Sequence, residues 1–195
     1  MRPTGHQALL DAARTEFAER GFTGTSVRDI ARRAGMSLSA MYHYYSGKDE
    51  LLAALVEESS DAFFAACRSA LAEAGEEPGE RLSAMVAATV RYRAERRVES
   101  QLLIAEWRHL SEERREAARK RQHDGTALFQ EIIEDGVAQG VFRTPYPDDA
   151  RRSVIAMCNA IAQWYRVEGE LSVDELASRY VELALVLVEW RPVRR

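Results

Sequence analysis

Apolar residues recur three and four positions apart along most of the chain, which is the spacing of one buried face of an α-helix. In the first such segment, from about residue 4 to residue 20, Leu10, Ala13 and Phe17 share a face. Gly21 follows and can end this helix with a positive φ. No segment shows the sustained apolar–polar alternation of a strand. The pattern predicts an all-α protein of about nine helices.

Serine residues mark the start of three further helices. Ser26 and Asp29 have the spacing of a capping box, in which each side chain bonds the backbone N–H of the other residue. Ser46 and Asp49 repeat that spacing before a long fourth helix, and Ser37 can cap a short third one. We therefore predict a head of three helices, followed by a long helix.

The clearest break in the helical pattern is the stretch Gly75-Glu76-Glu77-Pro78-Gly79, because glycine and proline both interrupt regular structure. The pattern resumes beyond this break and indicates a larger helical body. The helices expected there lie near residues 80–97, 100–109, 112–139, 148–168 and 173–191.

Charge is distributed unevenly along the chain. The whole sequence carries 27 basic and 31 acidic residues, a net charge of −4, yet residues 20–48 hold five basic residues and one acidic residue. A protein with a net negative charge is a poor non-specific binder of nucleic acid, whereas one positively charged end can bind an anionic partner. On charge alone, a solvated arginine-bearing helix explains this segment equally well.

Composition bears on where the protein works. The chain is 195 residues long and 46% apolar, which is enough to bury a core. No apolar run exceeds six residues, far below the roughly 18 of a membrane span, and charged residues interrupt the N-terminal segment where a signal peptide needs an apolar core. Cys67 and Cys158 are too far apart in sequence for a CxxC pair. We expect a cytoplasmic protein with no membrane partner.

Motifs of catalysis are missing from the sequence. There is no G-x-S-x-G, P-loop, G-x-G-x-x-G or H-E-x-x-H pattern. The four histidines have no metal-ligand spacing with one another or with cysteine. We predict that the chain is not an enzyme and has no cofactor and no metal; a helical enzyme with scattered catalytic groups stays open as an alternative.

Residues 27–44 have the pattern of a helix-turn-helix. Gly35 supplies the positive φ that a tight turn between two short helices needs, and the small Ala31 lets the helices approach closely. The second helix of such a motif enters the major groove of DNA. A generic helical hairpin would share the turn, but it would not explain the exposed face formed by Ser39, Ala40, Tyr42 and His43.

A longer run surrounds this motif and is more specific than the turn alone. It comprises Leu9-Leu10, Ala13, Phe17, Gly21-Phe22, Thr25, Ile30-Ala31, Ala34-Gly35-Met36-Ser37, Met41-Tyr42-His43-Tyr44-Tyr45, Lys48 and Leu51-Leu52. About fifty residues thereby resemble the TetR family of bacterial transcriptional regulators, although Leu38 and Ser39 stand where that family often has lysine and glycine. The resemblance implies a DNA-binding helix-turn-helix domain over residues 1–48 and a ligand-binding and dimerisation domain over residues 49–195.

The same resemblance implies roles on double-stranded operator DNA. Small side chains of the third helix would meet base edges, and hydroxyl, imidazole and ammonium groups would meet phosphates. Tyr44 and Tyr45 are expected in the core. The implied DNA-binding residues are Thr25, Ser26, Arg28, Ser37, Leu38, Ser39, Ala40, Tyr42, His43 and Lys48.

The last two predicted helices are apolar on two faces, and each helix must bury both. Packing against a second copy of the chain would achieve this, and so would a position wholly inside one chain. TetR-like regulators pair through their last two helices, so the resemblance implies a homodimer. The interface residues would be Val154, Met157, Ile161, Leu176, Tyr180, Leu183, Leu187 and Trp190.

Aromatic and methionine residues recur at helical spacing in the middle of the chain, a pattern that is more often core than ligand site. In the TetR family, residues of this kind surround a pocket for a small-molecule effector. The residues expected in such a pocket are Met85, Thr89, Tyr92, Leu103, Trp107, Phe129, Ile133, Asn159 and Trp164.

A second resemblance concerns the effector. Asn159, Trp164-Tyr165-Arg166, Gly169-Glu170-Leu171-Ser172, Glu175 and Tyr180 resemble the C-terminal pattern of TetR-type regulators of fatty-acid and sterol catabolism, which respond to acyl-CoA thioesters. Arg91, Arg93, Arg96 and Arg108 could meet the phosphates of coenzyme A or lie on the solvated surface. A TetR-like regulator of drug efflux remains the alternative; Glu106 is the candidate acid for binding a multidrug cation.

Overall fold

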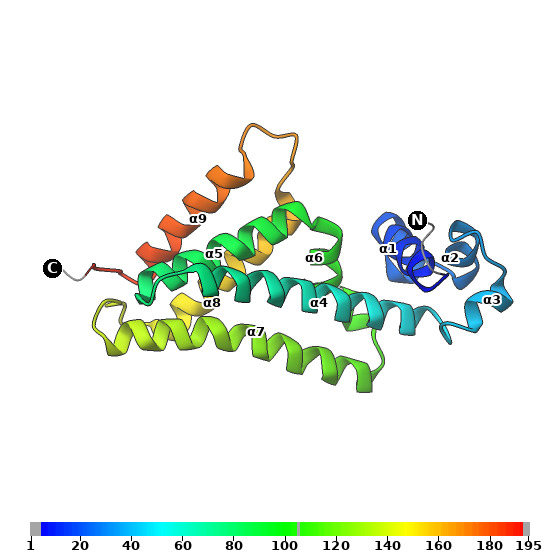
Figure 1. Cartoon of the computed structure of the whole chain (residues 1–195), viewed down its shortest axis with the longest axis horizontal. Helices are drawn as coiled ribbons and strands as arrows, with labels where there is room; N and C mark the ends of the chain where they lie inside the picture. The colour runs from blue at the N-terminus through cyan, green and yellow to red at the C-terminus, as the bar shows by residue number, and fades with distance from the viewer. Residues whose placement is uncertain (1–4, 105, 193–195) are drawn as a thin grey trace.

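The computed structural model describes residues 5–104 and 106–192, without the side chains of Leu103 and Gln122, and α-helices dominate that part of the chain (Figure 1). This confirms the predicted all-α class. The elements are α1 (Gly5–Gly24), α2 (Val27–Arg33), α3 (Leu38–Tyr42), α4 (Lys48–Glu73), α5 (Pro78–Glu95), α6 (Arg97–Ile104), the 3-10 turn η1 (Glu106–His109), α7 (Glu112–Ala138), α8 (Pro147–Trp164) and α9 (Val173–Leu187).

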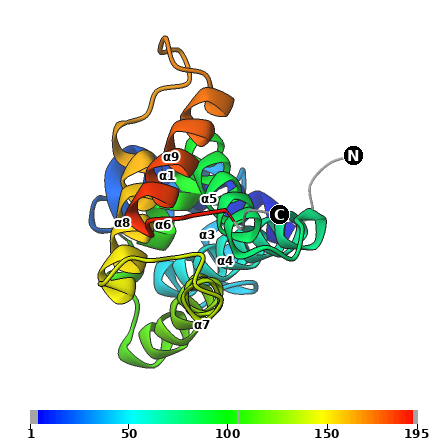
Figure 2. The same cartoon turned by 90° about the vertical axis from the view of Figure 1, so that its left-hand side faces the viewer.

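The helices form a head and a body joined by one long helix. α1, α2 and α3 lie at one end of the molecule, and α4 runs from them along the long axis into the body (Figure 1). In the view along that axis, α9 and the loop before it project on the side opposite α7 (Figure 2). None of the described helices is long and apolar enough to span a membrane.

Local capping chemistry sets the start of two head helices, as predicted. The Ser26 Oγ accepts a hydrogen bond from the Asp29 N–H at 3.2 Å, and the Asp29 carboxylate accepts one from the Ser26 N–H at 3.3 Å. The Ser37 Oγ accepts a hydrogen bond from the Ala40 N–H at 3.1 Å and thereby begins α3. These bonds satisfy backbone donors that the first turn of a helix leaves free.

The predicted capping box at Ser46 and Asp49 is wrong. Gly47 occupies the N-cap of α4, and Ser46 donates from both its N–H and its hydroxyl to the Glu50 carboxylate, at 2.6 and 2.8 Å. Asp49 instead accepts a hydrogen bond from the Ser111 N–H at 3.0 Å and pairs with Arg114 at 3.3 Å. A tertiary partner ahead of α7 therefore takes the carboxylate that local spacing assigned to the cap.

The long helix α4 contributes residues to two apolar cores. The head core joins residues of α1, α2 and α3 to Leu51, Leu52 and Leu55 of α4, and it also takes in Leu102 of α6. The body core begins with Phe63 on the same helix and continues through α5, α7, α8 and α9. The first turns of α4 thus pack with the head, although the helix begins at the boundary predicted between the two domains.

The last helix ends earlier than predicted. α9 stops at Leu187, and Glu189 has a φ of +51°, so the chain turns back. Trp190 then pairs with Phe142 in a single antiparallel bridge, and its indole lies against Gly79 at the start of α5. Trp190 therefore leaves the helical stripe on which it was placed as an interface residue.

A Gly79→Ala substitution tests this closure of the body. The added Cβ would overlap the Trp190 indole, with Cε2 only 2.8 Å away. Overpacking of this kind typically costs about 1–3 kcal/mol, more than the ~0.5–1 kcal/mol that alanine gains over glycine in a helix. We expect a net loss of about 1 kcal/mol or more, measured by urea unfolding. Gly24→Ala is the control, because its Cβ would make an ordinary 3.5 Å contact with Arg20; equal losses in both variants would contradict the prediction.

Candidate DNA-binding surface and effector cavity

The turn between α2 and α3 has the geometry that its sequence predicts. Gly35 has a φ of +69°, which side chains rarely adopt. Ile30, Ala31 and Met41 are fully or almost fully buried where the two helices meet. This packing fixes α3 relative to the rest of the head and leaves its other face free.

That free face of α3 carries the predicted base-reading residues. Ser39, Tyr42 and His43 are exposed, with half of the Tyr42 surface accessible, and Ala40 is half-buried beside them. Leu38 is half-buried and packs partly against the head core. The face is thus polar, aromatic and small, which suits contacts with base edges and phosphates.

Neighbouring positions extend this surface. Arg28 of α2 is exposed, and so is Tyr44, which was expected in the core but has 47% of its surface accessible. Tyr45 is buried as expected, with its hydroxyl 2.7 Å from the His6 Nε2. Of the two adjacent tyrosines, Tyr45 therefore lies in the core and Tyr44 on the surface. Tyr44 joins the candidate DNA-binding surface, although the sequence analysis expected it in the core.

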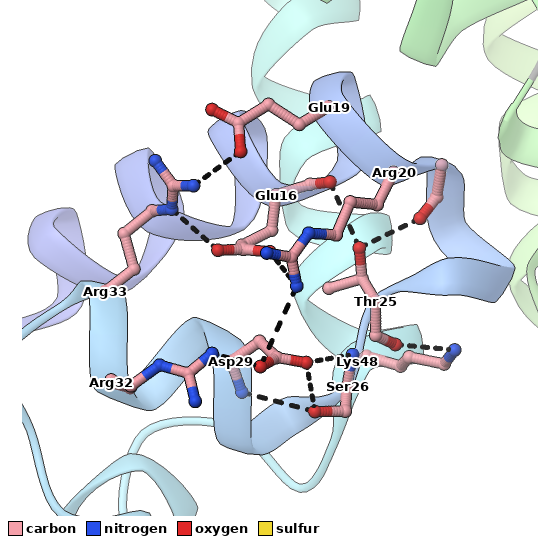
Figure 3. Close-up of polar contacts among 10 residues, drawn as sticks. Glu16, Glu19, Arg20, Thr25, Ser26, Asp29, Arg32, Arg33 and Lys48 are labelled. Atoms are coloured by element: carbon pink, nitrogen blue, oxygen red, sulfur yellow. Dashed lines mark hydrogen bonds and ion pairs between the residues drawn. The ribbon is translucent and has the colours of Figure 1, made fainter.

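Thr25 requires a correction. It is buried, and its hydroxyl points between two backbone carbonyl oxygens that accept its hydrogen bond, that of Gly21 at 2.9 Å and that of Glu16 at 3.1 Å (Figure 3). The hydroxyl therefore closes the bend at Gly21, where the helical dihedral angles are interrupted, and is not available to a phosphate. The Ser26 hydroxyl donates to the Asp29 carboxylate within its cap. The Ser37 Oγ only accepts, from the Ala40 N–H, so its O–H can still donate to a phosphate.

Lys48 has an internal role beside the predicted one. Its ammonium group donates to the Phe22 and Thr25 carbonyl oxygens at 2.8 and 3.0 Å and lies 4.4 Å from the centre of the Phe22 ring. These contacts fasten the start of α4 to the end of α1. An ammonium group has three N–H donors, so one remains for a phosphate.

Acidic residues offset much of the positive charge of the head. The almost fully buried Glu16 accepts from the Arg33 Nε at 2.7 Å and lies 3.5 Å from Arg20, while Glu19 accepts from the Arg33 Nη2 at 2.5 Å (Figure 3). The hydrogen bond from Arg33 to Glu16 is the main reason that the Arg33 pKa is raised. Glu16 and Glu19 lie just outside the basic window of residues 20–48, so counting charges within that window overstated the charge left for DNA.

A cavity lies in the body between α4, α5, α6, α7 and α8. The space inside it, counted together with open solvent at its mouth, is about 620 Å³. Aromatic and aliphatic side chains from four of these helices dominate its wall. The lining residues are Ser60, Phe63, Phe64, Thr89, Arg93, Ile104, Gly125, Thr126, Phe129, Ile155 and Asn159.

Three predicted pocket residues line this cavity: Thr89, Phe129 and Asn159. The others do not, and these placements are corrections. Met85, Tyr92 and Ile133 are buried in the body core and are not among the lining residues, Trp107 packs against the head core, and Trp164 is 48% exposed at the end of α8. The side chain of Leu103 lies outside the described residues.

The rest of the lining comprises Ser60, Phe63 and Phe64 of α4, Arg93 of α5, Ile104 of α6, Gly125 and Thr126 of α7, and Ile155 of α8. Of these, the sequence analysis considered only Arg93 for the effector. Helical periodicity indicates that α4 buries a face but not that a cavity lies against it. Arg93 did stand among the arginines considered for coenzyme A. The only signal that separated it from Arg91 was its position on the buried side of α5, two residues farther along.

The outer surfaces of α8 and α9 differ from the predicted interface in part. Val154, Ile161 and Leu176 are buried inside the single chain, which corrects their assignment, and Met157 and Tyr180 are half-buried against the same core. Leu183 and Leu187 are exposed as an interface would require. Val186, which was not predicted, is the most exposed apolar residue among them at 71%.

Comparison with known proteins identifies the family. Residues 9–55 match the model of bacterial regulatory proteins of the tetR family, and residues 75–188, more than half of the chain, match the tetracyclin repressor-like C-terminal domain. The chain belongs to the TetR family. It is therefore a DNA-binding regulator of transcription, as predicted, and not an enzyme.

Individual relatives of this TetR protein point the same way. The HTH-type transcriptional repressor KstR2 of Rhodococcus jostii is 32% identical over 181 residues, which cover 91% of this chain and 87% of the relative. The structure of the ketosteroid transcriptional regulator KstR2 of Mycobacterium tuberculosis has a TM-score of 0.86 at 25% identity and covers 98% of each chain. AibR, solved with isovaleryl coenzyme A and operator DNA, shares the fold, with a TM-score of 0.86, 23% identity and coverage of 96% of this chain and 100% of its own.

An Arg33→Gln substitution tests the ion-pair network of the head. It leaves the buried Glu16 carboxylate without its shortest charged contact, and hydrogen bonds to charged groups are worth about 1.5–3 kcal/mol. We expect the free energy of unfolding to fall by about 1–3 kcal/mol in urea titrations.

The matched control is Arg32→Gln. Arg32 pairs with Asp29 on the surface, where ion pairs contribute only about 0–1 kcal/mol. If the two variants lose equal stability, the buried position of Glu16 has no special weight.

Proposed function

We propose that this TetR-family protein is a homodimeric repressor that holds an operator through α3 and releases it when a small amphipathic effector fills the cavity of the body. The observation that carries the proposal is the exposed face of α3, with Ser39, Tyr42 and His43 presented by a turn that Gly35 and a buried helix crossing fix in place. Ser39 and Ala40 would read base edges, while Tyr42, His43, Arg28 and Lys48 would contact phosphates. Such a regulator works where the DNA is, in the bacterial cytoplasm.

Two copies of the head are needed for a useful site. A single α3 of five residues reaches only a few base pairs, and helix-turn-helix proteins gain specificity by placing two heads one helical turn apart or more. The exposed apolar side chains of Leu183, Val186 and Leu187 on α9 support pairing, because contiguous apolar surface marks interaction sites. A two-fold axis would bring this patch against its own copy.

The wall of the cavity is also connected to the head. α4 contributes Phe63 to the wall and Leu51, Leu52 and Leu55 to the head core. An effector that fits better to a shifted α4 would favour a state in which the two heads no longer match the operator.

A second connection runs through η1. Ile104, at the end of α6, lines the cavity. In the turn that follows, the Glu106 carboxylate accepts from the Phe22 N–H at 3.4 Å, and the His109 ring stacks on Phe22 at 5.4 Å. Movement at the cavity end of α6 would reach α1 by this route.

We further propose an acyl-CoA thioester as the effector. The C-terminal residue pattern of acyl-CoA-responsive regulators supports it, as does similarity to a ketosteroid regulator, and the AibR complex demonstrates that the fold can hold isovaleryl coenzyme A. The drug-efflux alternative loses its candidate acid, because Glu106 contacts Phe22 and is not among the cavity-lining residues.

Operator recognition is tested with Ser39→Ala. Loss of one hydroxyl contact should cost about 1 kcal/mol at one base pair, so the preference at that position should flatten about fivefold. Selection of binding sites from a randomised DNA pool, followed by mobility-shift titrations, measures this. Ser153→Ala on exposed α8 is the control and should keep the wild-type preference. An identical profile for Ser39→Ala would place base reading elsewhere, and failure of the wild type to bind any fragment of its own promoter would overturn the proposed function.

Dimerisation is tested with Val186→Glu. A charge buried in an apolar interface without a partner costs several kcal/mol, so the variant should be monomeric at micromolar concentration in light scattering coupled to size exclusion. Val137→Glu on α7, also at an exposed valine, should leave the wild-type mass unchanged. A dimeric Val186→Glu would remove α9 from the interface.

A further inference from the structure

The cavity contains an unusual charged group. Arg93 is the one ionisable side chain among the described residues that line it, and only 6% of its surface is exposed. Its Nε donates to the Asn159 Oδ1 at 3.1 Å, and its guanidinium lies 4.4 Å from the centre of the Phe63 ring. Its Nη1 is buried and has no hydrogen-bond partner. One edge of the guanidinium is therefore held in place while at least one donor on the other nitrogens is left unused.

Among the residues that the structure describes, no acidic side chain is paired with this charge. The neighbouring ionisable groups are Tyr92, Cys67 and Cys158, and burial raises their pKa values to about 12, about 11 and about 12. All three are neutral at pH 7. Burial lowers the pKa of Arg93 to about 10, which still leaves it protonated at pH 7. The cavity thus contains a positive charge that the surrounding described residues do not neutralise.

The other arginines considered for the effector do not share this environment. Arg91 pairs with Asp174 at 3.0 Å, Arg96 is exposed with Glu99 3.9 Å away, and Arg108 is exposed on η1. A buried unpaired charge costs several kcal/mol even after relaxation. Such a cost is typical of a binding site that awaits a ligand of opposite charge.

We propose that the effector is an apolar molecule bearing a carboxylate, and that this carboxylate binds the free edge of the Arg93 guanidinium while the apolar part lies against Phe64, Phe129 and Ile155. This inference rests on the proposed function, since it names the chemistry of the effector that releases the operator. A carboxylate accepts two parallel N–H bonds from a guanidinium and neutralises its charge. A neutral carbonyl would accept a bond without neutralising the charge, and a cation would be repelled.

Two sources could supply this chemistry. One is a free hydrophobic carboxylic acid, and the other is a coenzyme A thioester whose acyl chain ends in a second carboxylate. Both place the same group against Arg93, so each is paired in the test with a twin of equal length that lacks this carboxylate. The pairs are octanoate with octanamide, and suberoyl-CoA with octanoyl-CoA.

The test measures binding of each probe to the full-length protein by calorimetry and thermal shift, and release of operator DNA in a mobility-shift assay. In the wild type, the carboxylate member of at least one pair should bind ten-fold or more tightly than its twin and release the operator. Arg93→Met should abolish that preference. The matched control Arg91→Met, which removes an arginine on the exposed side of the same helix, should retain it.

A second variant distinguishes loss of carboxylate binding from misfolding of Arg93→Met. Arg93→Lys keeps the charge but loses the two-pronged geometry, so it should retain a reduced preference for the carboxylate. Arg93→Met should also melt no lower than the wild type without ligand, because it removes an unpaired buried charge.

The inference is overturned if both twins without the carboxylate bind as tightly as their carboxylate partners, or if the preference survives in Arg93→Met. It is also overturned if no straight-chain carboxylate from four to twelve carbons stabilises the wild type more than Arg93→Met. Failure of the proposed function looks different. In that case the carboxylate preference persists, but the ligand-free protein binds no DNA.

Discussion

The structure depends on the continuity of α4, which is buried in two cores along one uninterrupted helix. Leu51, Leu52 and Leu55 complete the core of the head, and within the next turns Phe63 reaches both the body core and the cavity wall. Packed interiors deform little and tend to shift between discrete arrangements. The same helix therefore contributes to the cavity wall and to the core of the head, which also contains Met41 of α3.

Phe22, near the end of α1, is in contact with α4 and η1. Lys48 of α4 contacts both the backbone carbonyl and the ring of Phe22, and the His109 ring of η1 stacks on the same ring. The end of α1 is therefore in contact with both elements. Lys48 and Glu106 each bind a backbone group of the same bend. Phe22 in the head thus contacts both α4 and η1.

Charge is used differently at the two ends of the molecule. In the head, Arg33 of α2 pairs with Glu16 and Glu19 of α1 and so joins the two helices, while Arg32 pairs with Asp29 within α2 and Arg20 with Glu16 within α1. In the body, Arg93 is held by Asn159 and Phe63 but has no acidic partner. The first arrangement stabilises the head, and the second leaves a buried positive charge in the wall of the cavity.

The sequence by itself determined the features that arise within one or two helical turns: the helical class, the caps at Ser26 and Ser37, the positive φ of Gly35, and the exposed face of α3. It also carried the family resemblance, because about fifty head residues match in order and spacing. Only the tertiary structure decided that the Thr25 hydroxyl bonds the Gly21 carbonyl oxygen and that the Asp49 carboxylate accepts from the Ser111 N–H and does not cap at Ser46. It also decided that Trp190 lies beyond the end of α9, and that Val154 and Leu176 are buried inside the chain. Periodicity identifies which face of a helix is buried, but the partner that buries it comes from residues distant in the sequence.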